Sequence, residues 1–218
     1  MEKNHEAVNT LLLNVSTGYI LLMQAGFALI ETGTVRSKNS KNILIKNMFD
    51  VCAGAIMWYF IGYGFAFGLK CIEDCDGEDP LKRRFIGSDG KYFAAAGFHD
   101  LEDDQFSFWC FQFSFAATAA TIVSGSLAER TQLPTYILFS CLMTGFIYPV
   151  VVAWTWGGGW LSRNGFHDFA GTGIVHMVGG AAGFVAALII KPRHGKEKDH
   201  NSKRNVTDDP NYEKLATK

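Results

Sequence analysis

The fold is decided by one stretch towards the carboxyl-terminal end of the chain, residues 168–193, which reads DFAGTGIVHMVGGAAGFVAALIIKPR. No Asp, Glu, Lys or Arg lies between Phe169 and Ile190. A helix that crosses the hydrocarbon core of a bilayer, about 30 Å thick, needs about 20 predominantly apolar residues. The stretch therefore predicts a helix that spans a membrane.

Four further blocks of the sequence are also free of ionised side chains, and each meets or nearly meets that length. They cover residues 7–30, 51–69, 105–128 and 131–162. Averages over the 218 residues hide this pattern, since a charged fraction of 19% and a mean hydropathy of +0.08 suit an ordinary single domain. The distribution of charge excludes a soluble globular protein. A formal net charge of −1 also gives nucleic acid no basic surface to bind.

The sequence therefore predicts an all-α, polytopic membrane protein with five spanning helices. We expect these helices at Val8–Ile30, Ile43–Leu69, Gln105–Leu127, Pro134–Trp156 and Asp168–Ile190. The chain divides into a transmembrane region, residues 1–191, and a polar tail, residues 192–218. The tail lacks an apolar period and is rich in charge, so we expect it to be disordered.

The charges of the connecting segments predict the orientation in the membrane. Basic residues crowd the first connection, and acidic residues fill the second, residues 70–104. Because cytoplasmic loops carry an excess of Lys and Arg, the first connection is expected in the cytoplasm, the amino terminus outside and the tail inside. The basic residues assigned to the first connection are Arg36, Lys38, Lys41 and Lys46.

The five cysteines do not form a CxxC motif, so we expect no metal site and no cofactor. Cys52, Cys110 and Cys141 lie in or beside apolar helices, where cysteine usually packs as a small hydrophobic residue. Cys71 and Cys75 share the acidic second connection. A local disulfide between them depends on whether that loop faces an oxidising compartment.

Three ionisable residues stand out within the expected helices, namely Asp50, Asp168 and His176. Such residues are costly in hydrocarbon and mark candidate functional sites. His176 follows Asp168 by eight residues, or about 12 Å along a helix. It is either a packing residue bonded to a neighbouring helix or a pore-lining residue that handles protons.

Aromatic residues also admit two interpretations. The tryptophans of residues 154–160 form either an interfacial belt or a wall that holds a cation over an indole ring. Phe108, Phe111 and Phe115 share one helix face, which is typical of packing but also suits a gate. Phe115 lies about 15 Å into its helix, at a depth comparable with His176.

Glycines in the second and fifth helices indicate close helix contact rather than phosphate binding, because no GxGxxG motif follows a strand. A membrane enzyme built on His176 and Asp168 remains an alternative. It has little support, because the sequence contains no GxSxG or HExxH motif.

Five motifs occur in order along residues 7–193: GTVRSKN at 33–39, FQFSFA at 111–116, AER at 128–130, WGGG at 156–159 and the stretch at 168–193. In sequence and spacing they resemble the motifs of the ammonium transporter (Amt) family. One position departs from the family signature, which prefers Gly, Ser or Cys where Thr172 stands. The pattern around it is intact.

The resemblance implies a role for each candidate residue. Trp156 would be the cation–π wall of an outer ammonium site, Phe115 the upper member of a stacked phenyl gate, and Asp168 a residue that shapes the site from behind. Because Asp168 begins a helix, its carboxylate can accept backbone N–H bonds. His176 and Phe111 would line the pore, His176 as the first of two pore histidines. Trp156 also favours the ammonium transporters over the related Rhesus proteins.

The resemblance further implies a channel-like transporter of ammonium and methylammonium rather than an enzyme. An intact cation would lose its water shell in an apolar lumen, so the expected route is capture at Trp156, loss of the proton near Phe115 and passage as ammonia. The family implies the plasma membrane and a homotrimer for the intact protein.

The family fold has eleven helices in two inverted halves, and the five expected helices correspond to the first half. The residues expected of the second half have no counterpart in this sequence. We therefore expect either a portion of a transporter or a shortened, non-conducting subunit that associates with full-length partners.

Overall fold

The structure is a computed structural model, and it describes residues 2–69, 85–98 and 105–192. In these residues all the regular elements are helical. The α-helices are α1 Glu2–Thr34, α2 Ser40–Met57, α3 Tyr63–Phe67, α4 Gln105–Leu127, α5 Leu133–Leu142, α6 Tyr148–Trp154, α7 Trp160–Arg163 and α8 Val178–Ile190. Two 3₁₀ turns, η1 Ser37–Asn39 and η3 Gly90–Tyr92, and three π-helical segments, η2 Trp58–Gly62, η4 Met143–Ile147 and η5 Thr172–Met177, complete the set.

The π-helical segments join neighbouring helices into continuous spans. The described residues contain five helices long and apolar enough to cross a membrane: His5–Thr34, Ser37–Phe67, Gln105–Leu127, Leu133–Trp154 and Thr172–Ile190. This confirms the five expected spans, and the third has the expected bounds. Residues 70–84 and 99–104 of the acidic second connection, with Cys71 and Cys75, and residues 193–218 of the tail lie outside the described residues.

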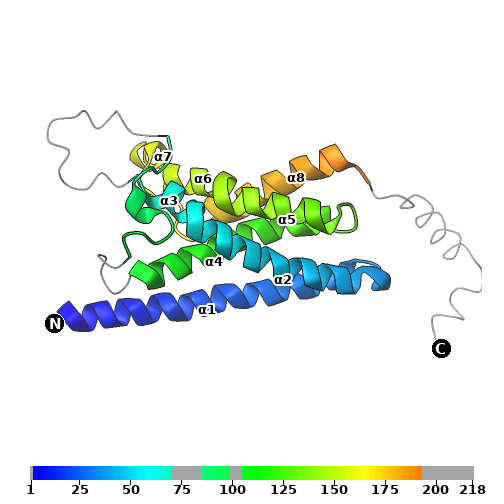
Figure 1. Ribbon diagram of the computed structural model, residues 1–218, viewed down its shortest axis with the longest axis horizontal. Helices are drawn as coiled ribbons and strands as arrows, with labels where there is room; N and C mark the ends of the chain where they lie inside the picture. The colour runs from blue at the N-terminus through cyan, green and yellow to red at the C-terminus, as the bar shows by residue number, and fades with distance from the viewer. Residues whose placement is uncertain (1, 70–84, 99–104, 193–218) are drawn as a thin grey trace, which may run out of the picture.

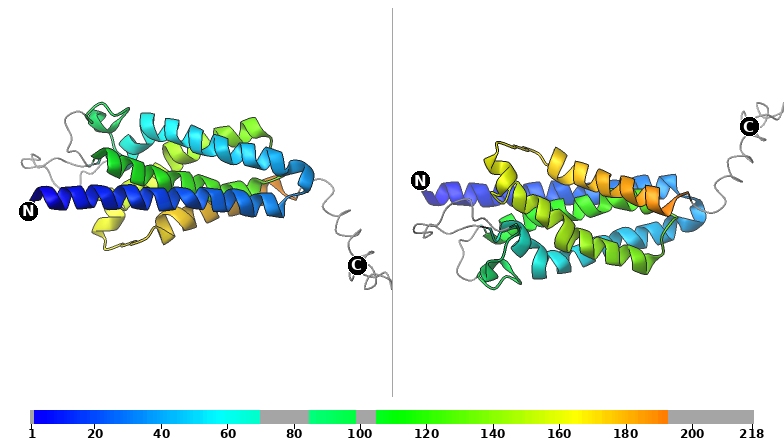
Figure 2. Two further views of the ribbon diagram at one scale, coloured as in Figure 1. Left: turned by 90° about the horizontal axis from the view of Figure 1, so that it is seen from below. Right: turned by 90° about the horizontal axis from the view of Figure 1, so that it is seen from above.

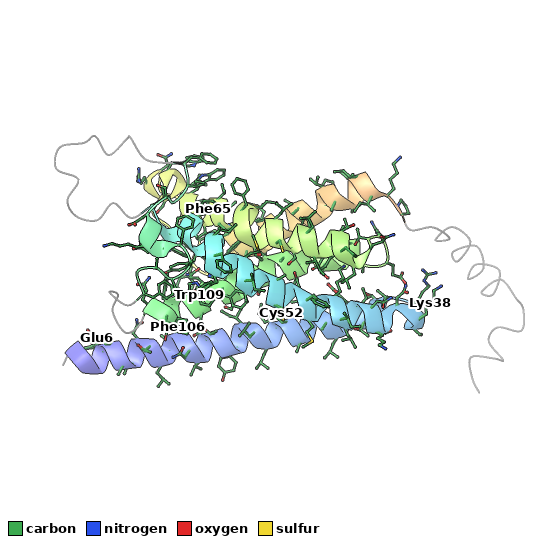
Figure 3. The ribbon with its side chains drawn as sticks, viewed as in Figure 1. Glu6, Lys38, Cys52, Phe65, Phe106 and Trp109 are labelled. Atoms are coloured by element: carbon green, nitrogen blue, oxygen red, sulfur yellow. The ribbon has the colours of Figure 1, made fainter. Side chains whose placement is uncertain are left out.

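The spans run side by side along the long axis of the molecule (Figures 1 and 2). One end, which we call the α7 end, holds the start of α1 together with α3 and α7. The opposite end, which we call the Lys38 end, holds the α1–α2 connection and the end of α8. Figure 3 shows Phe106 and Trp109 near the α7 end, whereas Lys38 lies at the far end of the bundle.

Helix α4 is the central helix and packs against α1, α2 and α8. Its interior side chains are small: Ala116, Ala117, Ala119 and Ala120 are at most 1% exposed. Small residues allow membrane helices to approach closely, where packing and hydrogen bonds can hold them together. Gly179 makes the approach of α8 to α4 possible, since a Cβ there would lie 2.9 Å from the carbonyl oxygen of Ala119.

Two of the π-helical segments, η2 and η4, pack against each other between the second and fourth spans. A Cβ on Gly62 would lie 2.6 Å from the carbonyl oxygen of Thr144, and one on Gly145 would lie 2.8 Å from Cε of Met57. The two glycines therefore allow the wider π turns to face each other.

A polar contact joins the two connections at the Lys38 end. Oε1 of Glu129 accepts hydrogen bonds from Nε of Arg36 at 3.0 Å, the backbone N–H of Arg36 at 3.2 Å and Nδ2 of Asn39 at 2.6 Å. These residues belong to the motifs GTVRSKN and AER, so the two motifs hold the α1–α2 and α4–α5 connections together.

One sequence-based assignment is wrong. Lys46 was expected among the basic residues of the first connection, but it lies within α2 and is 6% exposed. The connection itself ends at η1, before α2 begins at Ser40. Lys46 faces the bundle interior because it lies on the side of α2 that also carries the buried residues Ile43, Asn47 and Asp50.

Substituting Gly179 tests the close packing of α8 on α4. Gly179→Ala places a methyl group against backbone that cannot move away easily, so we expect a loss of about 1–3 kcal/mol in the free energy of unfolding. Thermal unfolding in detergent micelles measures it. The matched control is Gly180→Ala, where a Cβ meets nothing within 4 Å. Equal losses in both variants would contradict this packing.

Candidate functional site

Asp168 lies in the segment between α7 and η5, and its carboxylate binds the start of the last span. Oδ1 accepts the backbone N–H groups of Gly171 at 2.9 Å and Thr172 at 3.1 Å, and Oδ2 accepts those of Gly173 at 2.8 Å and Ile174 at 2.9 Å. The first N–H groups of a helix lack partners within it. The two oxygens of this one side chain accept the four N–H groups from Gly171 to Ile174. The expected bonds are present, although the helix begins at Thr172 rather than at Asp168.

These bonds also set the charge of the site. Partial burial raises the pKa of Asp168, but the four backbone N–H groups favour the ionised form more strongly and hold the pKa below its ordinary value. A negative charge therefore stays at the α7 end of the bundle at neutral pH.

The indole of Trp156 is fixed by the same residue. Its Nε1 donates a hydrogen bond to the backbone carbonyl oxygen of Asp168 at 2.7 Å. Gly171, at a φ of 82°, lies under the ring, and a Cβ at this position would stand 3.1 Å from Cη2 of Trp156. Both the positive φ and the close contact require glycine here.

The aromatic residues of α4 extend from this indole. The ring centroids of Phe115 and Trp156 lie 5.4 Å apart, and those of Phe111 and Phe115 lie 5.0 Å apart in an edge-to-face arrangement. These separations are those of favourable aromatic pairs. Three of the candidate residues named from the sequence thus form one continuous aromatic surface, and each is partly exposed.

His176 contacts Gly171, the residue that also lies against the Trp156 ring. Its Nδ1 lies 3.3 Å from the carbonyl oxygen of Gly171. Because a carbonyl oxygen can only accept, a neutral ring with its hydrogen on Nδ1 would donate to Gly171 and leave Nε2 as an acceptor. The side chain is exposed, on a face of the last span that also carries Met177 and Phe184.

Asp50, the remaining ionisable residue named from the sequence, lies elsewhere in the bundle. It is 1% exposed and accepts hydrogen bonds from Thr121 at 2.9 Å and from Ser140. Sequence reasoning missed two buried ionisable residues near it, Glu31 at 4% and Lys46 at 6% exposed. A signal existed, since Lys46 is flanked on both sides by apolar residues, Ile43–Ile45 and Met48–Phe49.

The arrangement defines a class of protein and a kind of site. The protein is a polytopic α-helical membrane protein. At one end of its bundle an indole, two phenyl rings and an ionised carboxylate lie together, and an imidazole contacts Gly171 beside them. Within the residues that the structure describes, no group of His, Cys, Asp or Glu side chains is suited to hold a metal ion. Aromatic faces beside a negative charge can attract a small cation.

The chain belongs to the ammonium transporter family, because the sequence profile of the Ammonium Transporter Family matches residues 11–211. It is 41% identical over 192 residues to the "Putative ammonium transporter sll1017" of Synechocystis sp., covering 87% of this chain and 41% of that protein. It is 40% identical over 200 residues to "Ammonium transporter 1 member 3" of Solanum lycopersicum, covering 88% and 40%. The chain thus spans about two fifths of the length of these curated relatives.

Solved structures agree with this assignment. The chain superposes on a "Sensor Amt Protein" with a TM-score of 0.77 and 32% identity, covering 90% of this chain and 47% of that one. It superposes on Candida albicans Mep2 with a TM-score of 0.68 and 26% identity, covering 85% and 39%. The five-helix arrangement is therefore that of a portion of an Amt/Mep transporter.

Removing the charge of Asp168 tests the electrostatics of the site. Asp168→Asn leaves one acceptor oxygen where two served four N–H groups, so we expect a loss of about 1–3 kcal/mol in the free energy of unfolding at neutral pH. Since the folded pKa is lowered, this stabilisation is present above the ordinary Asp value of 3.8 and disappears as the pH falls through the folded value.

Unfolding in detergent, followed from neutral pH to below that value, measures both effects. The variant is expected to lack this acid-dependent component. Asp89→Asn is the matched control, because that carboxylate accepts a single backbone N–H, from Lys91 at 3.0 Å. If Asp168→Asn kept the full acid dependence, the charge would not reside on Asp168.

Proposed function

We propose that this chain supplies the ammonium-capture site and one wall of the conducting pathway of an ammonium transporter. The observation that carries the proposal is the indole of Trp156, held by the carbonyl oxygen of Asp168 and packed against Phe115. Family membership supports ammonium as the substrate, and methylammonium as its close analogue.

Capture rests on the attraction of a cation to an aromatic face. An ammonium ion over the Trp156 ring gains about 0.5–2 kcal/mol, with the larger value where the ion is desolvated. Asp168 needs no direct contact with the ion. Its carboxylate is occupied by backbone N–H groups, yet its negative charge raises the local concentration of cations at the α7 end.

Passage rests on the cost of desolvation. An intact ammonium ion that entered an apolar lumen would lose its water shell at a cost of many kcal/mol, whereas neutral ammonia loses much less. We therefore propose that the proton leaves near Phe115 and that ammonia continues past the phenyl rings. Nε2 of His176 is then available to accept an N–H of the ammonia molecule.

The orientation follows from charge at the two ends of the bundle. Arg36, Lys38, Lys41 and Lys191 lie at the Lys38 end, which favours the cytoplasmic side for that end. The α7 end, with Trp156 and the amino terminus, would then face outward at the plasma membrane. The exposed face of the last span, with His176, would face the lumen, and the intact protein would assemble as a homotrimer.

Replacing Trp156 tests capture directly. Titration of the chain in lipid vesicles with ammonium and methylammonium, read by intrinsic fluorescence, gives the dissociation constants. Trp156→Leu removes the aromatic face, so we expect binding about 2- to 30-fold weaker. Trp160→Leu is the matched control, because Trp160 is 51% exposed at the same end and contacts Trp154 instead. Equal affinities in all three proteins would refute the assignment of Trp156.

Transport is measured separately, as methylammonium uptake by transporter-deficient cells that express the chain. Uptake that Trp156→Leu weakens and Trp160→Leu preserves would extend capture to conduction. Binding without uptake would assign conduction to a pore with more walls than this chain supplies, as expected of a non-conducting subunit.

A further inference from the structure

A second polar centre lies between α1, α2, α4 and α5, towards the Lys38 end and away from Trp156. It contains three buried ionisable side chains, Glu31, Lys46 and Asp50, exposed by 4%, 6% and 1%. Neutral groups complete it, namely Asn47, Thr121, Ser124, Tyr136 and Ser140. Two acids and one base in a buried centre raise the question of how their charges balance.

Asp50 has the surroundings of an ionised carboxylate. Thr121 Oγ1 donates to Oδ2 at 2.9 Å, and the Ser140 hydroxyl donates to Oδ1, so both oxygens have a donor. Hydrogen bonds to both oxygens stabilise the charged form of a carboxyl group. Asp50 therefore carries the negative charge of the centre.

Lys46 has the surroundings of an ammonium ion. Its Nζ donates to the carbonyl oxygen of Ser124 at 3.3 Å and lies 3.8 Å from the centroid of the Tyr136 ring. The electron-rich ring face attracts a cation. One positive charge on Lys46 balances one negative charge on Asp50, whose carboxylate attracts the ammonium group.

Glu31 differs from Asp50 in that only one of its oxygens has partners. Oε2 accepts from Nδ2 of Asn47 and from Oγ of Ser124, both at 2.9 Å. Oε1 is buried and has no hydrogen-bond partner among the described residues. It lies beside α4, 3.6 Å from the point where a Cβ on Gly125 would stand. An ionised Glu31 would leave an unsolvated oxygen and a net negative charge in the interior, which costs more than an uncharged acid.

We propose that Glu31 is a buried proton-binding site, whose carboxyl group stays neutral at neutral pH with its hydrogen on Oε1. The neutral acid still accepts through Oε2 and so joins α1 to Asn47 of α2 and Ser124 of α4. The ionisable groups that face it are Lys46 and Asp50 from α2 and Tyr136 from α5, while α4 contributes hydroxyl groups. This proton is independent of ammonium capture, because the centre shares no residue with the Trp156 site.

Infrared spectroscopy tests the proposal, because a protonated carboxylic acid has a carbonyl stretch that a carboxylate lacks. The chain in lipid bilayers at neutral pH is expected to show this band. Glu31→Gln is expected to abolish it, and Asp89→Asn, which removes a carboxyl group outside this centre, is the control that retains it. A band that is missing from the unsubstituted chain, or that survives Glu31→Gln, would overturn the proposal.

Stability provides a second measurement. Gln is neutral and nearly isosteric with a protonated Glu, and its oxygen can accept from Asn47 and Ser124. Glu31→Gln is therefore expected to fold and, at neutral pH, to be at least as stable as the unsubstituted chain, because the unfolded chain releases the Glu31 proton above its ordinary value of 4.5 while the folded chain keeps it. The unsubstituted chain should accordingly lose stability as the pH rises from that value towards neutrality, and the variant should lack that loss. Failure of Glu31→Gln to fold would show that the centre needs the charge, which also overturns the proposal.

Discussion

A bilayer core offers no water to hydrogen-bond with, so every buried donor, acceptor and charge of this bundle must find its partner within the protein. Asp168 is the clearest example of a residue that provides such partners. Its two carboxylate oxygens accept the four leading N–H groups of the last span, and its backbone carbonyl accepts the indole N–H of Trp156. Asp168, which accepts the first N–H groups of the last span, thus also orients the indole ring of Trp156. Helix initiation and site geometry cannot be separated, because one residue serves both.

Helix α4 connects the Trp156 site with the buried acids near the Lys38 end. Phe111 and Phe115 in its first half contact the Trp156 site, and Thr121 and Ser124 in its second half contact the buried acids. The residues between are small, so α4 lies close to its neighbours and has little freedom to shift. The contact of Glu129 with Arg36 then fixes the end of α4 to the α1–α2 connection. Helix α4 therefore fixes the separation between the Trp156 site and the buried centre that contains Glu31, Lys46 and Asp50.

The sequence predicted those features that depend on local composition. Charge-free blocks gave all five spans, and the position of Asp168 at a helix start indicated its backbone bonds. Features that depend on several helices at once were not predicted. The π-helical segments η2 and η4 pack against each other where Gly62 approaches the backbone of Thr144, a contact between two spans that no single segment reveals. Lys46 was assigned to a loop because basic residues usually mark the cytoplasmic surface, and only the approach of Tyr136 and Ser124 provides it with an interior site. Likewise, the estimate of about 12 Å for the depth of His176 assumed a helix from Asp168, whereas the helix begins at Thr172, and the contact of His176 with Gly171 required the fold.

The last span has two different faces. Gly179 and Gly183 face α4, where a Cβ on Gly183 would lie 3.0 Å from Oγ of Ser126, and the larger residues Phe184, Leu188 and Ile189 are exposed. Apolar side chains on that face suit either lipid or a second protein surface. His176 distinguishes the two, because an imidazole directed into lipid would lose its hydrogen bonds at a high cost. A face that combines this imidazole with apolar neighbours therefore supports the lumen proposed above.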